Sequence, residues 1–154
     1  MVNIDWCKKQ KKGIVLIEPN DNLSEEYIKT AEETLEILRS IKNKSRVWLA
    51  ITKYYCEYFA VYSFLMKIGI KSEIHDCTIE IAKLLEEKGI LPEGYAKILN
   101  DDKRLRIDNQ YYLKNREVIV DYDSILEFVL KIKDINNKLT KAEIIKFRRI
   151  VQSR

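Results

Sequence analysis

The chain has 154 residues, of which 46% are hydrophobic and 34% are charged. This mix describes one domain with a substantial core and excludes a wholly disordered chain, which combines high charge with low hydrophobicity. Four glycines and two prolines leave few of the turns that a β-rich fold needs, so an all-α fold is expected. The net charge of +4 permits nucleic-acid binding without indicating it, since most lysine-rich helices solvate an outer face.

Residues 1–22 are expected to form an N-terminal arm ahead of a single helical domain at 23–154. Residues 13–19 read Gly-Ile-Val-Leu-Ile-Glu-Pro, which suits a short extended segment, and the polar residues that follow suit a turn. The start of the chain has no apolar run ahead of its charges, so no secretory signal is expected. Cys7, Cys56 and Cys77 form no pair at metal or redox spacing, and their low, odd number favours the reducing cytoplasm.

The apolar periodicity of the rest of the chain predicts an up-and-down bundle of five to six helices. In chain order, the expected helices span 24–42, 45–68, 72–89, 95–113, 123–135 and a short last stretch from Thr140. Ser45 and Gly69 suit the two ends of the second helix. Thr140 and Glu143 stand at the spacing of a capping box.

The second expected helix, 45–68, carries most of the apolar content. Its polar residues Lys53, Glu57 and Lys67 leave nearly the whole circumference apolar. We therefore expect part of this helix to form a homodimer interface. No membrane span is expected, because the charge-free stretch 58–66 is far shorter than the roughly 20 residues that cross a bilayer.

The sequence offers few residues of the usual catalytic types. It contains one histidine, His75, no glycine-rich phosphate loop and no cysteine–histidine set at zinc spacing. His75 and Cys77 fall on opposite faces of the third expected helix, so we expect neither a metal site nor a cofactor. A capping or packing role for His75 remains an alternative to a functional one.

The richest polar cluster lies in the expected helix 95–113. Its members are Arg104, Arg106, Asp108, Asn109, Tyr111 and Tyr112. Helical spacing places Arg106 and Asn109 on one face, and Arg104, Asp108 and Tyr111 on another. Guanidinium groups bind phosphate in a bidentate manner and phenols donate or stack, so these faces suit an RNA or nucleotide. Intrahelical ion pairs are the plainer reading of the same residues.

Two parts of the sequence form a pattern of aromatic and polar residues at fixed spacing. The first consists of Trp48, the pair Tyr54-Tyr55, Gly69 and His75, and the second runs from Arg106 to Tyr111. The first resembles the aromatic signature, and the second the later R-x-x-x-D-Y element, of small prokaryotic HEPN-domain proteins of the UPF0332-like group. With the first helix, the resemblance covers roughly residues 23–135.

The resemblance implies a helical bundle that is usually dimeric and is often paired, as the toxin, with a minimal nucleotidyltransferase antitoxin. The RNA-cleaving branches of the family carry R-x(4–6)-H, whose arginine and histidine assist a metal-independent transesterification. Here Tyr111 and Tyr112 follow Arg106 where that histidine falls, and His75 belongs to another helix. A phenol with an ordinary pKa near 10 is a poor base at neutral pH.

Two mechanisms and one structural alternative follow. In the first, a dimer brings two Arg106 side chains to a phosphodiester, Tyr111 or His75 assists proton transfer, and the protein is a ribonuclease. In the second, the cleft binds RNA or a nucleotide through Arg104, Asp108, Asn109 and Tyr112 without cutting it. A variant of the second offers Tyr111 or Tyr112 as the acceptor of a nucleotidyl group. A purely structural bundle is the third.

Overall fold

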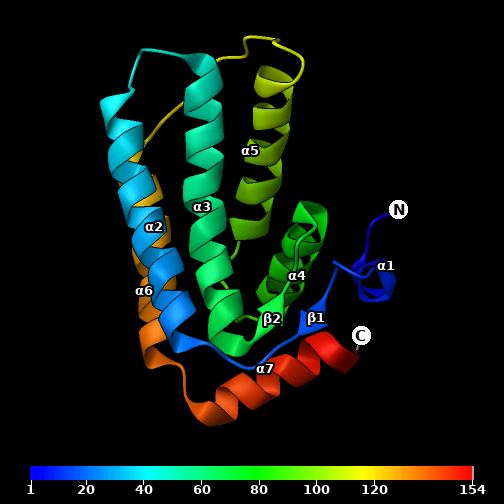
Figure 1. The fold of residues 1–154 in the computed structure, drawn as a ribbon. Helices are drawn as coiled ribbons and strands as arrows, with labels where there is room; N and C mark the ends of the chain where they lie inside the picture. Colours follow the sequence, from blue (N-terminus) through cyan, green and yellow to red (C-terminus); the bar gives the residue numbers. More distant parts are fainter. Residues whose placement is uncertain (154) are drawn as a thin grey trace.

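A computed structural model describes residues 1–153, which form an all-α bundle with one short antiparallel strand pair (Figure 1). The helices and strands of this part of the chain are α1 (Ile4–Lys9), β1 (Val15–Leu16), α2 (Asp21–Ser40), α3 (Arg46–Ile68), β2 (Ile70–Lys71), α4 (His75–Glu87), α5 (Tyr95–Gln110), α6 (Tyr122–Lys138) and α7 (Lys141–Ser153). The expected all-α class is confirmed.

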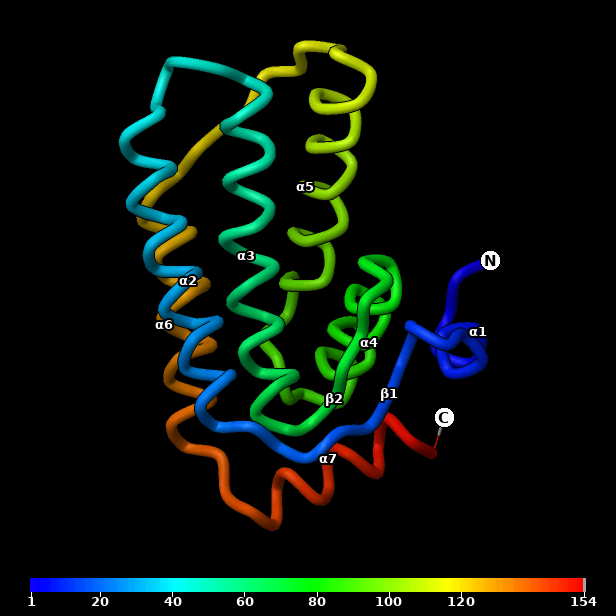
Figure 2. Tube along the Cα trace, viewed as in Figure 1, coloured from blue at the N-terminus to red at the C-terminus, as the bar shows by residue number. Residues whose placement is uncertain are grey.

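Helix α3 is the central element of the bundle. It contacts α2, α5, α6, α7 and β2, and the trace in Figure 2 shows it between the long helices α2 and α5, with α7 crossing the lower end. The Ser45 side chain accepts a hydrogen bond from the Trp48 amide, and Gly69 ends the helix with a left-handed backbone (φ 76°), both as expected. The helices of one chain therefore cover most of α3, and its apolar circumference no longer argues for a dimer.

Several expected boundaries are shifted. Helix α4 begins at His75, not Ser72, because Ile70 and Lys71 first pair with β1. Helix α5 ends at Gln110, so Tyr112 and Leu113 lie beyond it; Leu113 has a positive φ of 48°, which a helix does not allow. The Thr140–Glu143 capping box is present in both directions.

The N-terminal arm is docked on the body of the protein. It contains the helix α1, which the sequence did not predict, and its extended segment pairs with β2 in the register Val15 with Lys71 and Leu16 with Ile70. Asn3 caps α1 by accepting a hydrogen bond from the Trp6 amide. Figure 1 shows α1 beside α4 and near the C-terminal end of α7.

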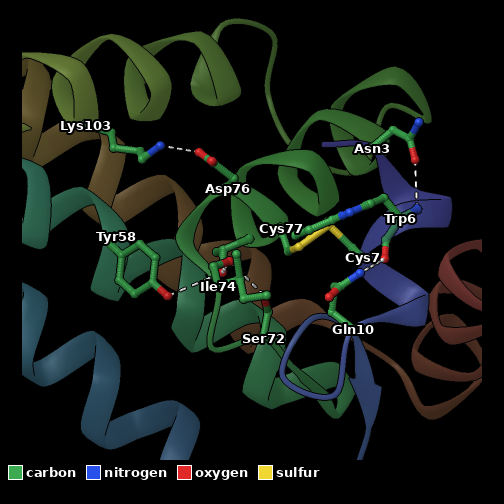
Figure 3. The surroundings of a disulfide bond; sticks show 11 residues. Asn3, Trp6, Cys7, Gln10, Tyr58, Ser72, Ile74, Asp76, Cys77 and Lys103 are labelled. Carbon is green, nitrogen blue, oxygen red and sulfur yellow. Dashed lines mark hydrogen bonds and ion pairs between the residues drawn. A yellow bond between two sulfur atoms is a disulfide. The ribbon is translucent and has the colours of Figure 1, made fainter. Parts of the chain in front are cut away.

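No two cysteines stand at metal or redox spacing in the sequence, but Cys7 of α1 and Cys77 of α4 form a disulfide, which the sequence did not predict (Figure 3). Their Cα atoms lie 5.7 Å apart although 70 residues separate them in sequence. Local spacing tests only neighbours along the chain, whereas folding of the arm onto α4 creates this pair. Cys56 is free and buried in the core.

Within residues 1–153, no helix combines the length and apolar character needed to cross a bilayer.

The junction of α3 and β2 is closed by a side chain from α7. Arg148 Nη1 lies 2.7 Å from the Ile17 carbonyl oxygen and 2.8 Å from that of Gly69. A Cβ added at Gly69 would lie 2.2 Å from Arg148 Nη1 and 2.4 Å from the Ile17 carbonyl oxygen. Gly69 is therefore needed for two reasons: its backbone has a positive φ, and the segment before α2 and the helix α7 approach it too closely for a Cβ.

We expect Gly69→Ala to lower the free energy of unfolding by clearly more than the roughly 1–2 kcal/mol that a left-handed backbone costs an L-residue. Gly89→Ala is the matched control, because Gly89 has a similar φ of 72° but no atom within 4 Å of an added Cβ. Urea unfolding of both variants measures the difference. Equal losses would contradict the proposed close packing at Gly69.

Candidate functional site

Arg106 lies in a buried position on α5, where its guanidinium faces two tyrosines of α3. Arg106 is only 8% exposed. The guanidinium carbon lies 5.0 Å from the ring centroid of Tyr54 and 5.4 Å from that of Tyr55. Such desolvated cation–π contacts contribute roughly 1–2 kcal/mol each. The arginine is thus held in place by aromatic rings and not by a carboxylate.

The hydrogen-bonding capacity of Arg106 is only partly used. Its Nη1 donates to the Gln110 side-chain oxygen at 3.3 Å. Its Nε is buried and has no partner among the described residues. A guanidinium that is not neutralised by an acid retains its positive charge and its capacity to bind an anion.

His75 is brought to the same cluster from the first turn of α4. Its ring stacks on Tyr58 with centroids 4.4 Å apart, and its Nδ1 lies 2.8 Å from the Tyr54 hydroxyl oxygen. Tyr54 therefore contacts both His75, through its hydroxyl, and Arg106, through its ring face. His75 is half-buried and Tyr54 is completely buried.

The surroundings keep the imidazole neutral. Burial lowers the pKa of His75 below its ordinary value of 6.5, and the positive charges of Arg106 and Lys103 lower it further, while Asp76 acts in the opposite direction. Burial also raises the pKa of the Tyr54 phenol, which stays protonated. Because the unfolded chain binds the histidine proton more readily, the stability that the neutral form provides is lost as the pH falls below 6.5.

Two ion pairs, one of them largely buried, fix the helices around the cluster. Lys103 of α5 binds Asp76, the residue after His75, as Figure 3 shows. Lys53 of α3 binds Asp102 at 2.6 Å, one helical turn before Arg106. Glu57, nearly inaccessible beside Lys53, has its pKa raised by burial and by the neighbouring Asp102. These contacts hold α3, α4 and α5 in register.

The predicted site residues fall into three places. Arg106 and His75 meet through Tyr54, although they lie on different helices. Tyr111 and Tyr112 are 64% and 68% exposed past the end of α5, and no contact to Arg106 or His75 is recorded for them within residues 1–153. Arg104 lies on the outer side of α5 and lines a groove of about 990 Å³ between α4 and α5, which neither Arg106 nor His75 lines.

Asp108 and Asn109 hold the loop that follows α5. Asp108 binds Arg116 at 2.8 Å and Lys114 at 3.3 Å, and the hydrogen bond from Arg116 is the main cause of its lowered pKa. The fully buried Asn109 side chain donates to the Arg116 carbonyl oxygen at 2.9 Å and accepts from the Arg116 amide at 2.8 Å. The side-chain polar atoms of Asp108 and Asn109 therefore bind residues 114 and 116 of the same chain, and in this structure they stabilise the loop.

The role of the α3 tyrosines as walls of the site is not predicted from the sequence. Tyr54 and Tyr58 are one helical turn apart, and Tyr55 lies beside them, so the spacing alone places a ring cluster on one side of α3. Their partner on α4 was not visible from the sequence. The described part of the chain contains no group of three or more histidine, cysteine or acidic residues that could hold a metal ion.

The comparisons with known proteins give no family model, no curated relative and no solved structure that matches this chain.

We expect the single histidine to titrate with a midpoint below 6.5, and Arg106→Gln to raise that midpoint by removing a nearby positive charge. A proton NMR titration of the one imidazole signal measures both values without assignment. Arg149→Gln, an exposed change of equal charge on α7, is the control and leaves the midpoint in place. An equal His75 midpoint in the wild type and in Arg106→Gln would contradict the effect of the Arg106 charge on the His75 pKa.

Proposed function

We propose that the protein is a HEPN-like, metal-independent endoribonuclease that acts as the toxin-like half of a pair with a nucleotidyltransferase antitoxin. The observation that supports this most is the cluster of Arg106, Tyr54 and His75. A buried, uncompensated guanidinium beside a neutral imidazole supplies an anion site and a proton acceptor together. The resemblance of residues 48–75 and 106–111 to HEPN proteins points the same way.

In the proposed reaction, Arg106 binds the non-bridging oxygens of an RNA phosphodiester. His75 Nε2 removes the proton from the 2′-hydroxyl, in the tautomer in which Nδ1 donates to Tyr54. The 2′-oxygen then bonds to phosphorus as the bond to the 5′-oxygen breaks, and the same proton passes to that leaving oxygen. The products are a 2′,3′-cyclic phosphate and a free 5′-hydroxyl, and positive charge from Arg106 stabilises the phosphorane-like transition state.

In this proposal the histidine of another helix replaces the one that the R-x(4–6)-H element places after the arginine. Tyr54 connects the two groups within one chain. A second copy is therefore not needed to bring an imidazole to Arg106. The homodimer is retained as a proposal that rests on the resemblance to HEPN proteins, and the cytoplasmic location as a proposal that rests on the low, odd number of cysteines.

We expect wild-type protein to cleave labelled single-stranded RNA in the presence of EDTA. His75→Gln should lower the rate about 10²–10⁴-fold, the usual contribution of a general base. Arg106→Gln should weaken both RNA binding and cleavage, because it removes the charge that binds phosphate. Gel-resolved cleavage and fluorescence anisotropy measure the two effects separately.

Arg149→Gln controls for loss of one surface charge and should behave as wild type. Cleavage by Arg106→Gln at the wild-type rate would remove the proposed site. RNA binding that needs Arg106, without any cleavage, would favour the non-catalytic binding protein instead. Light scattering of the same samples reports whether the active species is a dimer.

A second candidate function, acceptance of a nucleotidyl group, is favoured by the exposure of Tyr111 and Tyr112. A phenol reacts as an acceptor only where a partner enzyme reaches it, and these two stand past the end of α5. We expect co-incubation with ATP and a minimal nucleotidyltransferase of the kind paired with HEPN proteins to add a nucleotidyl mass. The double change Tyr111→Phe and Tyr112→Phe should abolish it. An unchanged mass increase in that variant would exclude both tyrosines.

A further inference from the structure

The disulfide is the covalent link between the N-terminal segment 1–11 and α4, and Ile4 of the same segment packs against the core cluster. Helix α1 has six residues, too few to be stable in isolation, and Cys7 is its only buried residue. Lys8 Nζ also donates a hydrogen bond to the Gln152 carbonyl oxygen of α7 at 2.8 Å. Figure 3 shows the sulfur bridge joining α1 to the first turns of α4.

From Lys12 onward, the chain is anchored independently of the disulfide. The Glu73 amide donates to the Lys12 carbonyl oxygen at 2.9 Å, and the β1–β2 pair follows directly. The Ile17 amide then donates to the Gly69 carbonyl oxygen at 2.9 Å. If the disulfide opens, only the residues before Lys12 can therefore detach, and the β1–β2 pair stays in place.

The disulfide is completely buried, since Cys7 and Cys77 are both 0% exposed. The large core cluster formed by α2 to α7 nevertheless includes Cys56 and neither Cys7 nor Cys77. The bond joins α1 to α4 and does not link α4 to any other helix of the bundle. Opening it is thus a local event and not global unfolding.

Segment 1–11 borders the groove between α4 and α5. Val2 lines this groove of about 990 Å³ together with Ile79 and Glu80 of α4, and a smaller hollow lies between Asn3, Ile4, Asp5 and Glu80. Helix α4 has no side-chain cap at its N-terminus, so its first turn relies on contacts such as the one made by Cys77. Release of the segment would widen the groove and change the surroundings of the turn that carries His75, while the contacts of His75 and Asp76 to α3 and α5 keep that turn in place.

We propose that Cys7–Cys77 is a redox-sensitive latch that holds segment 1–11 against α4. A dithiol reductant opens it: two electrons and two protons pass from the reductant, which becomes a disulfide, to the two cysteine sulfurs, which become thiols. In the open state, segment 1–11 leaves α4, and Cys77 and the α4 wall of the groove become accessible. The latch does not depend on the proposed nuclease activity.

Limited proteolysis with trypsin tests the latch, because segment 1–11 contains three lysines, at positions 8, 9 and 11. Samples are oxidised or treated with dithiothreitol, digested briefly, acid-quenched, and then all reduced before mass analysis. We expect cleavage at these lysines to be about tenfold or more faster in the reduced protein, because cleavage follows the population of the open segment. The single histidine signal in NMR should shift with the same treatment.

Two variants separate the latch from other effects of the reductant. Cys7→Ser should be cleaved rapidly with or without reductant, whereas Cys56→Ser should keep the wild-type dependence on reductant. Equal cleavage of oxidised and reduced wild type, or intact masses that show two free thiols after oxidation, would overturn the proposal. Reduction that exposes tryptic sites throughout the bundle would also overturn it, because the disulfide would then brace the whole fold.

Discussion

Helix α3 must bury almost its whole circumference, and the rest of the fold is organised around that need. A helix with so wide an apolar surface is stable only when other elements remove it from water on several sides. Here α2, α5, α6 and α7 do so within one chain. The site depends on the same helix, since the tyrosines that hold Arg106 and His75 belong to α3.

The site illustrates how burial and charge act together. Arg106 is desolvated against aromatic rings. Removing a guanidinium from water costs less hydration free energy than removing an ammonium, because the guanidinium charge is spread over a plane. The charge of Arg106 and the burial of His75 both favour the neutral imidazole. A fixed cation can stabilise developing negative charge, and a neutral histidine beside it can accept a proton. This arrangement depends on the packing of both α4 and α5 against α3, because each of these two helices carries one of the two groups.

The disulfide gives the N-terminal arm a different status from the bundle. The bundle helices are held by many apolar contacts, each small, so that no single one decides their position. The segment before Lys12 is joined to α4 by one covalent bond and has a single fully buried residue in its helix, Cys7. A stability contrast of this kind within one chain confines a redox response to the terminus and to the α4 turn that it touches.

The sequence by itself determined the all-α class, the main helices and their caps at Ser45, Gly69 and Thr140, because periodicity and capping are local properties of the chain. It also pointed to Arg106 and His75 as separate candidates. Only the tertiary structure decided that Tyr54 contacts both of them, that the Asn109 side chain is hydrogen-bonded to the loop after α5, and that Cys7 forms a disulfide with Cys77. These facts depend on contacts between residues 21 to 70 positions apart or on where a helix ends, and local spacing carries no record of either.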